Sequence, residues 1–211
     1  MRLFSYLPAV AVLILSMQAT EAAAQMGGGR SGMSTAAPLT NVKPYKELQN
    51  MGACVARYER KKALTLIATV PGSKEEEAMF DRLFFGERET CMPGGAQMVM
   101  PVIFARGALA EGLLSVGGVP DTLRLKSSAP QEVKDLHGAA RCYTSGNRNA
   151  VATLLKTTPG SPEEIKAVAG LWNDFRTCMP GFNVRLNAPW IRFLLAEALL
   201  RLEPGTTASG G

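Results

Sequence analysis

The feature that most constrains this chain is a set of short phrases that each occur twice. Cys-Met-Pro-Gly stands at 91–94 and again at 178–181, Leu-Ala-Glu at 109–111 and 195–197, and Pro-Gly-Ser at 71–73 and 159–161. The matched positions keep the same order and lie 86 to 88 residues apart. Self-similarity at a nearly fixed separation indicates one structural unit used twice. The sequence therefore predicts an internal duplication.

Helical signals recur inside each copy. Ser73 and Ser161 are each followed three residues later by a glutamate, Glu76 and Glu164, which is the capping-box pattern at the start of a helix. Pro162 stands at the first helical position, where its missing N–H costs nothing. Apolar residues elsewhere in each copy recur at helical spacing. We expect an all-α fold of two tandem, similar units of about four helices each.

The two units are predicted at 44–114 and 131–203, with a linker at 115–130 that contains glycine and proline. The last helix of each unit, starting near Pro101 or Asn187, is apolar nearly all round. Such helices are usually buried, so each is expected to pack within its own unit and against the other unit.

The two ends of the chain carry different signals. Residues 1–24 have a positive start, an apolar run and an Ala-rich end, the three parts of a secretory signal peptide. Residues 25–43 and 204–211 are rich in small and polar residues, which predicts a flexible leader and a disordered tail. We expect a periplasmic or secreted protein with no transmembrane segment after signal cleavage.

The four cysteines occupy corresponding positions in the two copies. Beyond a secretion signal they meet an oxidising compartment, so disulfides are expected. Four cysteines allow three pairings, and a unit copied whole brings its own bond. This predicts Cys54–Cys91 and Cys142–Cys178, each worth on the order of 4 kcal/mol on the loop-entropy model. No close spacing of cysteines indicates a metal or redox site.

Two charged pairs persist on the very apolar last helices: Arg106 with Glu111, and Arg192 with Glu197. Five residues apart, the members of a pair lie on different faces of a helix and need not contact each other. We expect these four residues to anchor neighbouring elements, for example by bonding terminal carbonyls; a ligand-binding role is the alternative. The single histidine, His137, is expected to be an exposed polar residue.

The sequence offers no catalytic residue, metal site or cofactor motif. It has no nucleophile elbow, no phosphate-binding loop and no dinucleotide fingerprint placed between a predicted strand and a helix. The net charge is +5, but the basic residues are dispersed and no motif indicates nucleic-acid binding. We expect no cofactor and no nucleic-acid partner.

The order of a cysteine, Pro-Gly-Ser-x-Glu-Glu, Cys-Met-Pro and Leu-Ala-Glu resembles small exported proteins of Gram-negative bacteria built as a tandem helical repeat. The resemblance covers about residues 45–202 and implies export and duplication, with no catalytic residue to transfer. The expected function is a non-enzymatic binding or structural module of the cell envelope, with an envelope protein or polymer as partner. The alternative is a periplasmic, hydrolase-like enzyme with a carboxylate-based site between the two units.

Overall fold

The computed structural model describes residues 42–84, 91, 100–117, 133–182 and 184–202. Within these residues the chain forms eight helices and no β-strand, which confirms the predicted all-α class. None of the described helices has the length and hydrophobicity needed to cross a bilayer. The predicted signal peptide, the tail, and most of the leader and linker lie outside the described residues.

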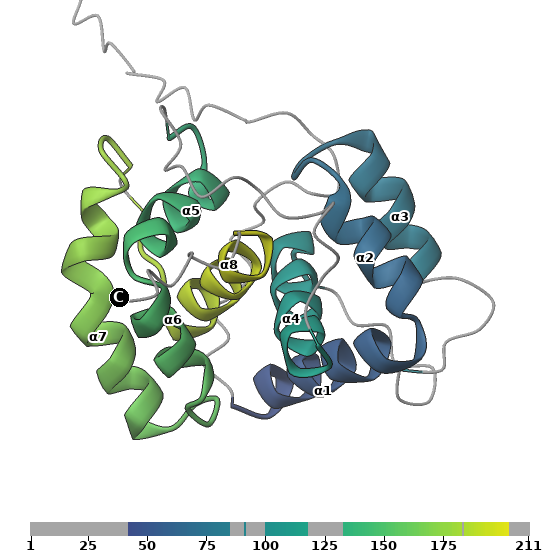
Figure 1. Ribbon diagram of the computed structural model, residues 1–211, viewed down its shortest axis with the longest axis horizontal. Coiled ribbons are helices and arrows are strands. Elements are labelled where there is room, and N and C mark those ends of the chain that lie inside the picture. The colour runs from purple at the N-terminus through teal and green to yellow at the C-terminus, as the bar shows by residue number, and fades with distance from the viewer. Residues whose placement is uncertain (1–41, 85–90, 92–99, 118–132, 183, 203–211) are drawn as a thin grey trace, which may run out of the picture.

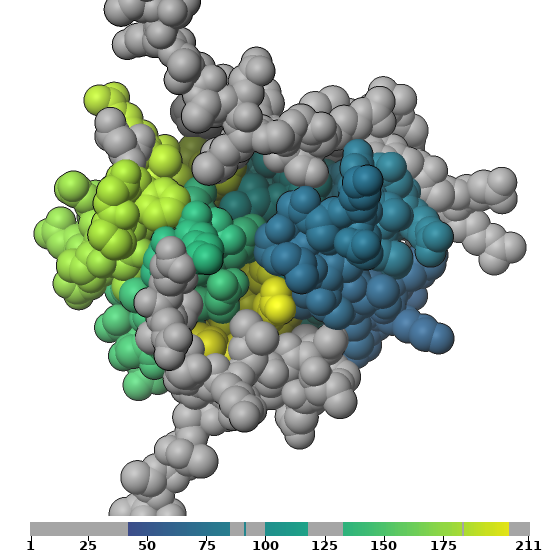
Figure 2. Space-filling model, turned by 90° about the horizontal axis from the view of Figure 1, so that it is seen from above, coloured from purple at the N-terminus to yellow at the C-terminus, as the bar shows by residue number. Residues whose placement is uncertain are grey.

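Two central helices, α4 (Val102–Ser115) and α8 (Ala188–Arg201), pack side by side between two groups of helices (Figure 1). One group consists of α1 (Val42–Tyr58), α2 (Arg60–Ala68) and α3 (Lys74–Phe84). The other consists of α5 (Leu136–Gly146), α6 (Arg148–Leu155) and α7 (Pro162–Thr177). In the space-filling view, α8 is visible between the two groups (Figure 2).

The predicted caps form, with one difference from the expected capping box. The Ser73 hydroxyl accepts from the Glu76 N–H at 3.1 Å, and Ser161 accepts from the Glu164 N–H at 3.2 Å. The glutamate side chains reach back one residue further than expected, to the backbone N–H groups of Gly72 and Gly160, both at 2.7 Å. Each glutamate therefore fixes the turn that precedes its helix. The first helix starts at Val42, so the end of the predicted leader is helical.

The contact between α4 and α8 depends on a glycine. A Cβ atom at Gly107 would lie 2.1 Å from the Cβ of Phe193 and 2.5 Å from its Cα, far inside van der Waals contact. Because Gly107 carries no side chain, the two helix backbones approach each other closely. Phe193 in turn packs its ring edge-on against Tyr45, with the ring centroids 5.5 Å apart.

The buried apolar residues form two clusters. The first is built mainly from α1–α4, and the second is built mainly from α5–α8. Helix α8 contributes to both, because Phe193 and Ala196 belong to the first cluster and Leu194 and Leu195 to the second. The prediction that the last helix packs both within its own half and against the other is therefore confirmed for α8.

Both disulfides pair as predicted. Cys54 on α1 is bonded to Cys91, with a Cα–Cα distance of 5.6 Å, and Cys142 on α5 is bonded to Cys178, with a distance of 5.8 Å. Each bond stays within one half of the chain. That the halves are copies of a single unit stays a prediction of the sequence.

Candidate functional site

Arg106 of α4 lies at the centre of a buried polar network and has no solvent exposure. Its Nε donates to both carboxylate oxygens of Glu197 at 3.1 Å, and its Nη1 donates to Glu76 at 2.9 Å. The same guanidinium bonds the carbonyls of Leu66 at 3.0 Å and Ile67 at 3.1 Å. These carbonyls lie in the last turn of α2, where a helix leaves backbone acceptors unsatisfied. One side chain thus joins α2, α3, α4 and α8.

Arg192 of α8 makes the corresponding contacts, but it binds a glutamate on α4, whereas Arg106 of α4 binds a glutamate on α8. Its Nε donates to both oxygens of Glu111 on α4 at 3.1 Å, and its Nη1 donates to Glu164 at 3.0 Å. It also bonds the carbonyls of Leu154 at 3.3 Å and Leu155 at 2.8 Å, in the last turn of α6. The four charged residues singled out in the sequence are therefore brought together in two crossed pairs, each arginine binding the glutamate of the other helix.

The pair formed by Arg106 and Glu197 is charged although it is buried. Burial alone would raise the pKa of Glu197, but the charge of Arg106 and the contact with His137 outweigh it and hold that pKa well below its usual range. Burial alone would lower the pKa of Arg106, yet Glu197 and Glu76 raise it above the ordinary value. Glu197 is therefore an ionised acceptor, with Arg201 a further cation 3.5 Å away.

Sequence reasoning missed that Glu76 and Glu164 are part of these networks. Both were interpreted only as helix caps, but they are 2 % and 0 % exposed and each is bonded to a buried arginine. The signal was available, since glutamate occurs at both matched positions just as arginine does at 106 and 192. Glu164 has one further partner, the hydroxyl of Tyr45, which donates to it. Burial and this bond raise the pKa of Tyr45.

The prediction that His137 is an exposed polar residue is wrong. Its side chain is 13 % exposed, and its Nδ1 lies 3.1 Å from Glu197. The matched residue in the other half is Gln49, whose Nε2 donates to both oxygens of Glu111 at 2.8 Å. Each inter-helix glutamate thus has a polar neighbour from the first helix of its own half: Glu197 has His137 on α5, and Glu111 has Gln49 on α1. The sequence could not show this, because helix contacts that distant in the chain are set by packing.

A mostly apolar cleft of about 350 Å³ opens beside the network. It lies between the loop before α3, the start of α4, the start of α5 and the segment leading into α8. Its apolar walls are formed by Pro71, Pro101, Val102, Ile103, Leu136, Phe182, Val184 and Trp190. Four charged or titratable residues also contribute to its lining: Glu76, Lys134, Asp135 and His137. Trp190 is held in place by Phe104, with ring centroids 4.5 Å apart.

A second, more polar cavity of about 490 Å³ lies beside the repeated Cys-Met-Pro-Gly phrase of the second half. Met179, Pro180 and Gly181 line it together with Trp172 and two arginines, Arg176 and Arg185. Phe182 and Val184 line both this cavity and the apolar cleft. The phrase therefore contributes a cavity wall as well as a disulfide cysteine.

Neither protein-family models, nor curated proteins, nor solved structures match the chain. Similarity therefore assigns it no activity. Among the described residues there is also no group of three or more His, Cys, Asp or Glu side chains arranged to hold a metal ion.

Proposed function

We propose that the chain is an exported, non-enzymatic binding module of the cell envelope that holds an apolar ligand in the cleft between α4, α5 and α8. The observation that carries the proposal is the cleft itself. Its volume of about 350 Å³ and its largely apolar walls with a few polar groups are typical of small-molecule sites. Trp190 and Phe182 supply the aromatic surface that such sites favour.

The disulfides support the assignment to the envelope. Two cystine bonds account for all four cysteines, and structural disulfides form and persist in oxidising compartments. The signal-peptide pattern at residues 1–24 points to the same compartment. Periplasm or extracellular space is therefore the proposed location.

The charged network supports binding over carboxylate catalysis. A general acid needs a carboxyl group whose pKa is raised towards the working pH. The carboxylates between the two halves, Glu111 and Glu197, are instead each bonded by an arginine, and the pKa of Glu197 is held low. Their geometry fits a rigid frame around the cleft.

The test uses N-phenyl-1-naphthylamine, an uncharged dye that fluoresces in apolar sites, titrated into the purified disulfide-bonded chain. We expect saturable binding at one site, with energy transfer from Trp190 to the dye. Val102→Glu places a carboxylate in the cleft and should weaken binding at least tenfold. It should fold normally, because Val102 is the first residue of α4 and an acidic group there is favoured by the helix dipole.

Ile165→Glu is the matched control, since Ile165 is an apolar residue near the start of α7 that is 60 % exposed and lines neither cavity. It should bind the dye like the parent chain. The proposal fails if the parent shows no saturable binding, or if Val102→Glu binds as tightly as Ile165→Glu while both remain folded by circular dichroism.

A further inference from the structure

The apolar cleft and the second cavity are neighbours that share a wall. Phe182 and Val184 each contribute to the lining of both, so the apolar cleft and the polar cavity adjoin at these two residues. A ligand that contacts both Phe182 and Val184 would touch apolar surface at one end and polar surface at the other. The two volumes, about 350 and 490 Å³, are each in the range of small-molecule sites.

The second cavity carries an unbalanced positive charge. Arg176 and Arg185 contribute to its lining, and no acidic residue does. Among the described residues, neither guanidinium lies in a salt bridge, in contrast to the fully paired Arg106 and Arg192. Arginine side chains recognise carboxylates and phosphates through paired, charge-assisted hydrogen bonds. This cavity therefore suits an anionic group.

The charges that line the apolar cleft also favour an anionic group in the second cavity over one in the cleft. Glu76 is already neutralised by Arg106, and His137 lies against Glu197. Lys134 and Asp135 at its edge carry opposite charges. The cleft thus has no excess positive charge to attract an anion, whereas the adjoining cavity has two arginines.

We infer that the two adjoining cavities together bind an anionic amphiphile, a single hydrocarbon chain with a carboxylate or phosphate headgroup. The hydrocarbon lies in the apolar cleft against Trp190, and the headgroup is bound by Arg176 and Arg185 beside Trp172. This inference rests on the proposed function, because it requires the cleft to be a binding site, and it adds the class of ligand.

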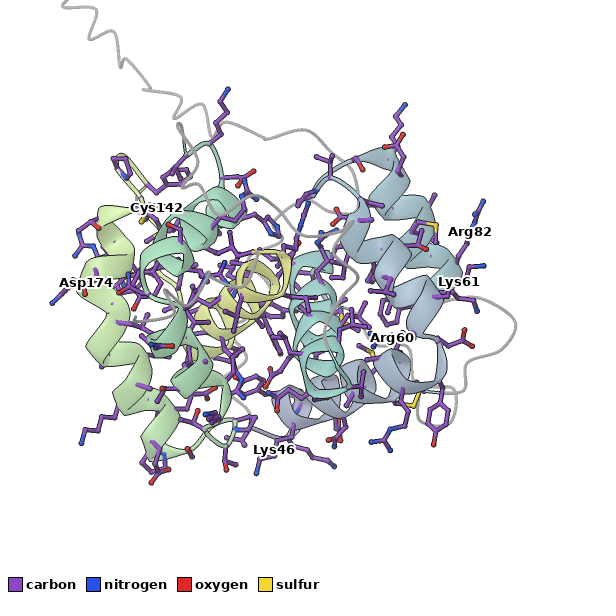
Figure 3. The ribbon with its side chains drawn as sticks, viewed as in Figure 1. Lys46, Arg60, Lys61, Arg82, Cys142 and Asp174 are labelled. Atoms are coloured by element: carbon purple, nitrogen blue, oxygen red, sulfur yellow. A yellow bond between two sulfur atoms is a disulfide. The ribbon has the colours of Figure 1, made fainter. Side chains whose placement is uncertain are left out.

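The test measures how decanoate, decyl phosphate and decan-1-ol displace N-phenyl-1-naphthylamine, with the anions below their micelle-forming concentrations and decan-1-ol below its solubility limit. The quantity compared is the ratio of the dissociation constant of decanol to that of each anion, in the parent and in Arg176→Gln/Arg185→Gln. We expect the double substitution to lower this ratio about tenfold or more for at least one anion, with decanol binding unchanged. Arg82→Gln is the control, since Arg82 is an exposed arginine in the last turn of α3, on the outer side of the molecule (Figure 3).

The two tryptophans report on the two ends of the ligand separately, because they are the only ones in the chain. Trp190→Phe leaves Trp172 beside the arginines, and Trp172→Phe leaves Trp190 in the cleft. One anion should change the fluorescence of both variants over the same concentration range.

The outcomes separate the two proposals. If the dye and decanol bind but the ratios are the same in the parent and the arginine variant, the anionic headgroup is refuted and the apolar site stands. If an anion changes only the fluorescence of Trp172 and displaces no dye, a single ligand spanning both cavities is likewise refuted. If neither the dye nor decanol binds the parent, both proposals fall.

Discussion

Replacing Arg106 by methionine tests the role of the crossed ion pairs. Methionine keeps much of the volume of the side chain but none of its five donors. In the variant, the buried carboxylates of Glu197 and Glu76 both lose the guanidinium of Arg106, and the carbonyls of Leu66 and Ile67 lose a donor. The substitution should therefore weaken the contacts of α4 with all three of its partners, α2, α3 and α8.

The expected loss is large. Breaking a buried ion pair by removing one partner costs about 3–5 kcal/mol, because an uncompensated charge is left behind. Glu197 and Glu76 are 3 % and 2 % exposed, so water can replace little of the lost bonding. A folded chain has only about 5–15 kcal/mol of stability in total. Arg106→Met should thus remove about 4 kcal/mol, a substantial part of the whole.

Urea unfolding followed by circular dichroism, with both disulfides intact, measures this loss. With a slope of about 2 kcal/mol per molar urea, the midpoint should fall by roughly 2 M. Arg82→Met, at an exposed arginine, should change stability by less than about 0.5 kcal/mol. Adding Glu197→Gln to Arg106→Met should recover part of the loss, since it removes one of the two carboxylates left without the guanidinium. A loss below about 1 kcal/mol for Arg106→Met would refute the reasoning.

Two further predictions concern the same central helices. The folded-state pKa of Glu197 lies below the unfolded value of about 4.3. Its contribution to stability is therefore complete above that value and is lost as the pH falls towards the folded-state pKa. Below about pH 4 the free energy of unfolding should fall less steeply in Glu197→Gln than in the parent, as measured by urea titrations at a series of pH values; parallel curves would contradict the assignment. Gly107→Ala should cost about 1–3 kcal/mol, because its methyl group must push Phe193 away. The control Gly170→Ala, at an exposed position of α7 with nothing within 4 Å, should stabilise the chain by about 0.5–1 kcal/mol, and equal effects of the two substitutions would refute the close approach of α4 and α8.

The helices and the disulfides could be predicted from the sequence because their signals are local or duplicated. Ser73 and Ser161 mark helix starts through hydrogen bonds to backbone N–H groups only three residues further along the chain. The cysteine pairing followed from the matched positions of Cys54 and Cys142, without knowledge of the fold. Local chemistry and internal repetition were sufficient for this level of description.

The networks and cavities could not be predicted because they depend on how distant helices pack. The sequence singled out Arg106 and Arg192, but their pairing with Glu197 and Glu111 follows from the contact of α4 with α8, which Gly107 permits. The apolar cleft draws its lining from four separate stretches of the chain. The spacing of apolar residues within one helix does not show which residues of different stretches will line one cleft.

The most direct test of the account is a ¹H–¹⁵N spectrum of the purified chain titrated with decanoate, because it locates the ligand without any substitution. The account predicts that the largest shift changes occur at the Trp190 indole N–H and at the backbone amides of Val102, Ile103 and Leu136, which line the apolar cleft. Saturating shifts that leave these four groups unchanged, or no saturating shifts at all, would contradict the assignment of the cleft as a binding site.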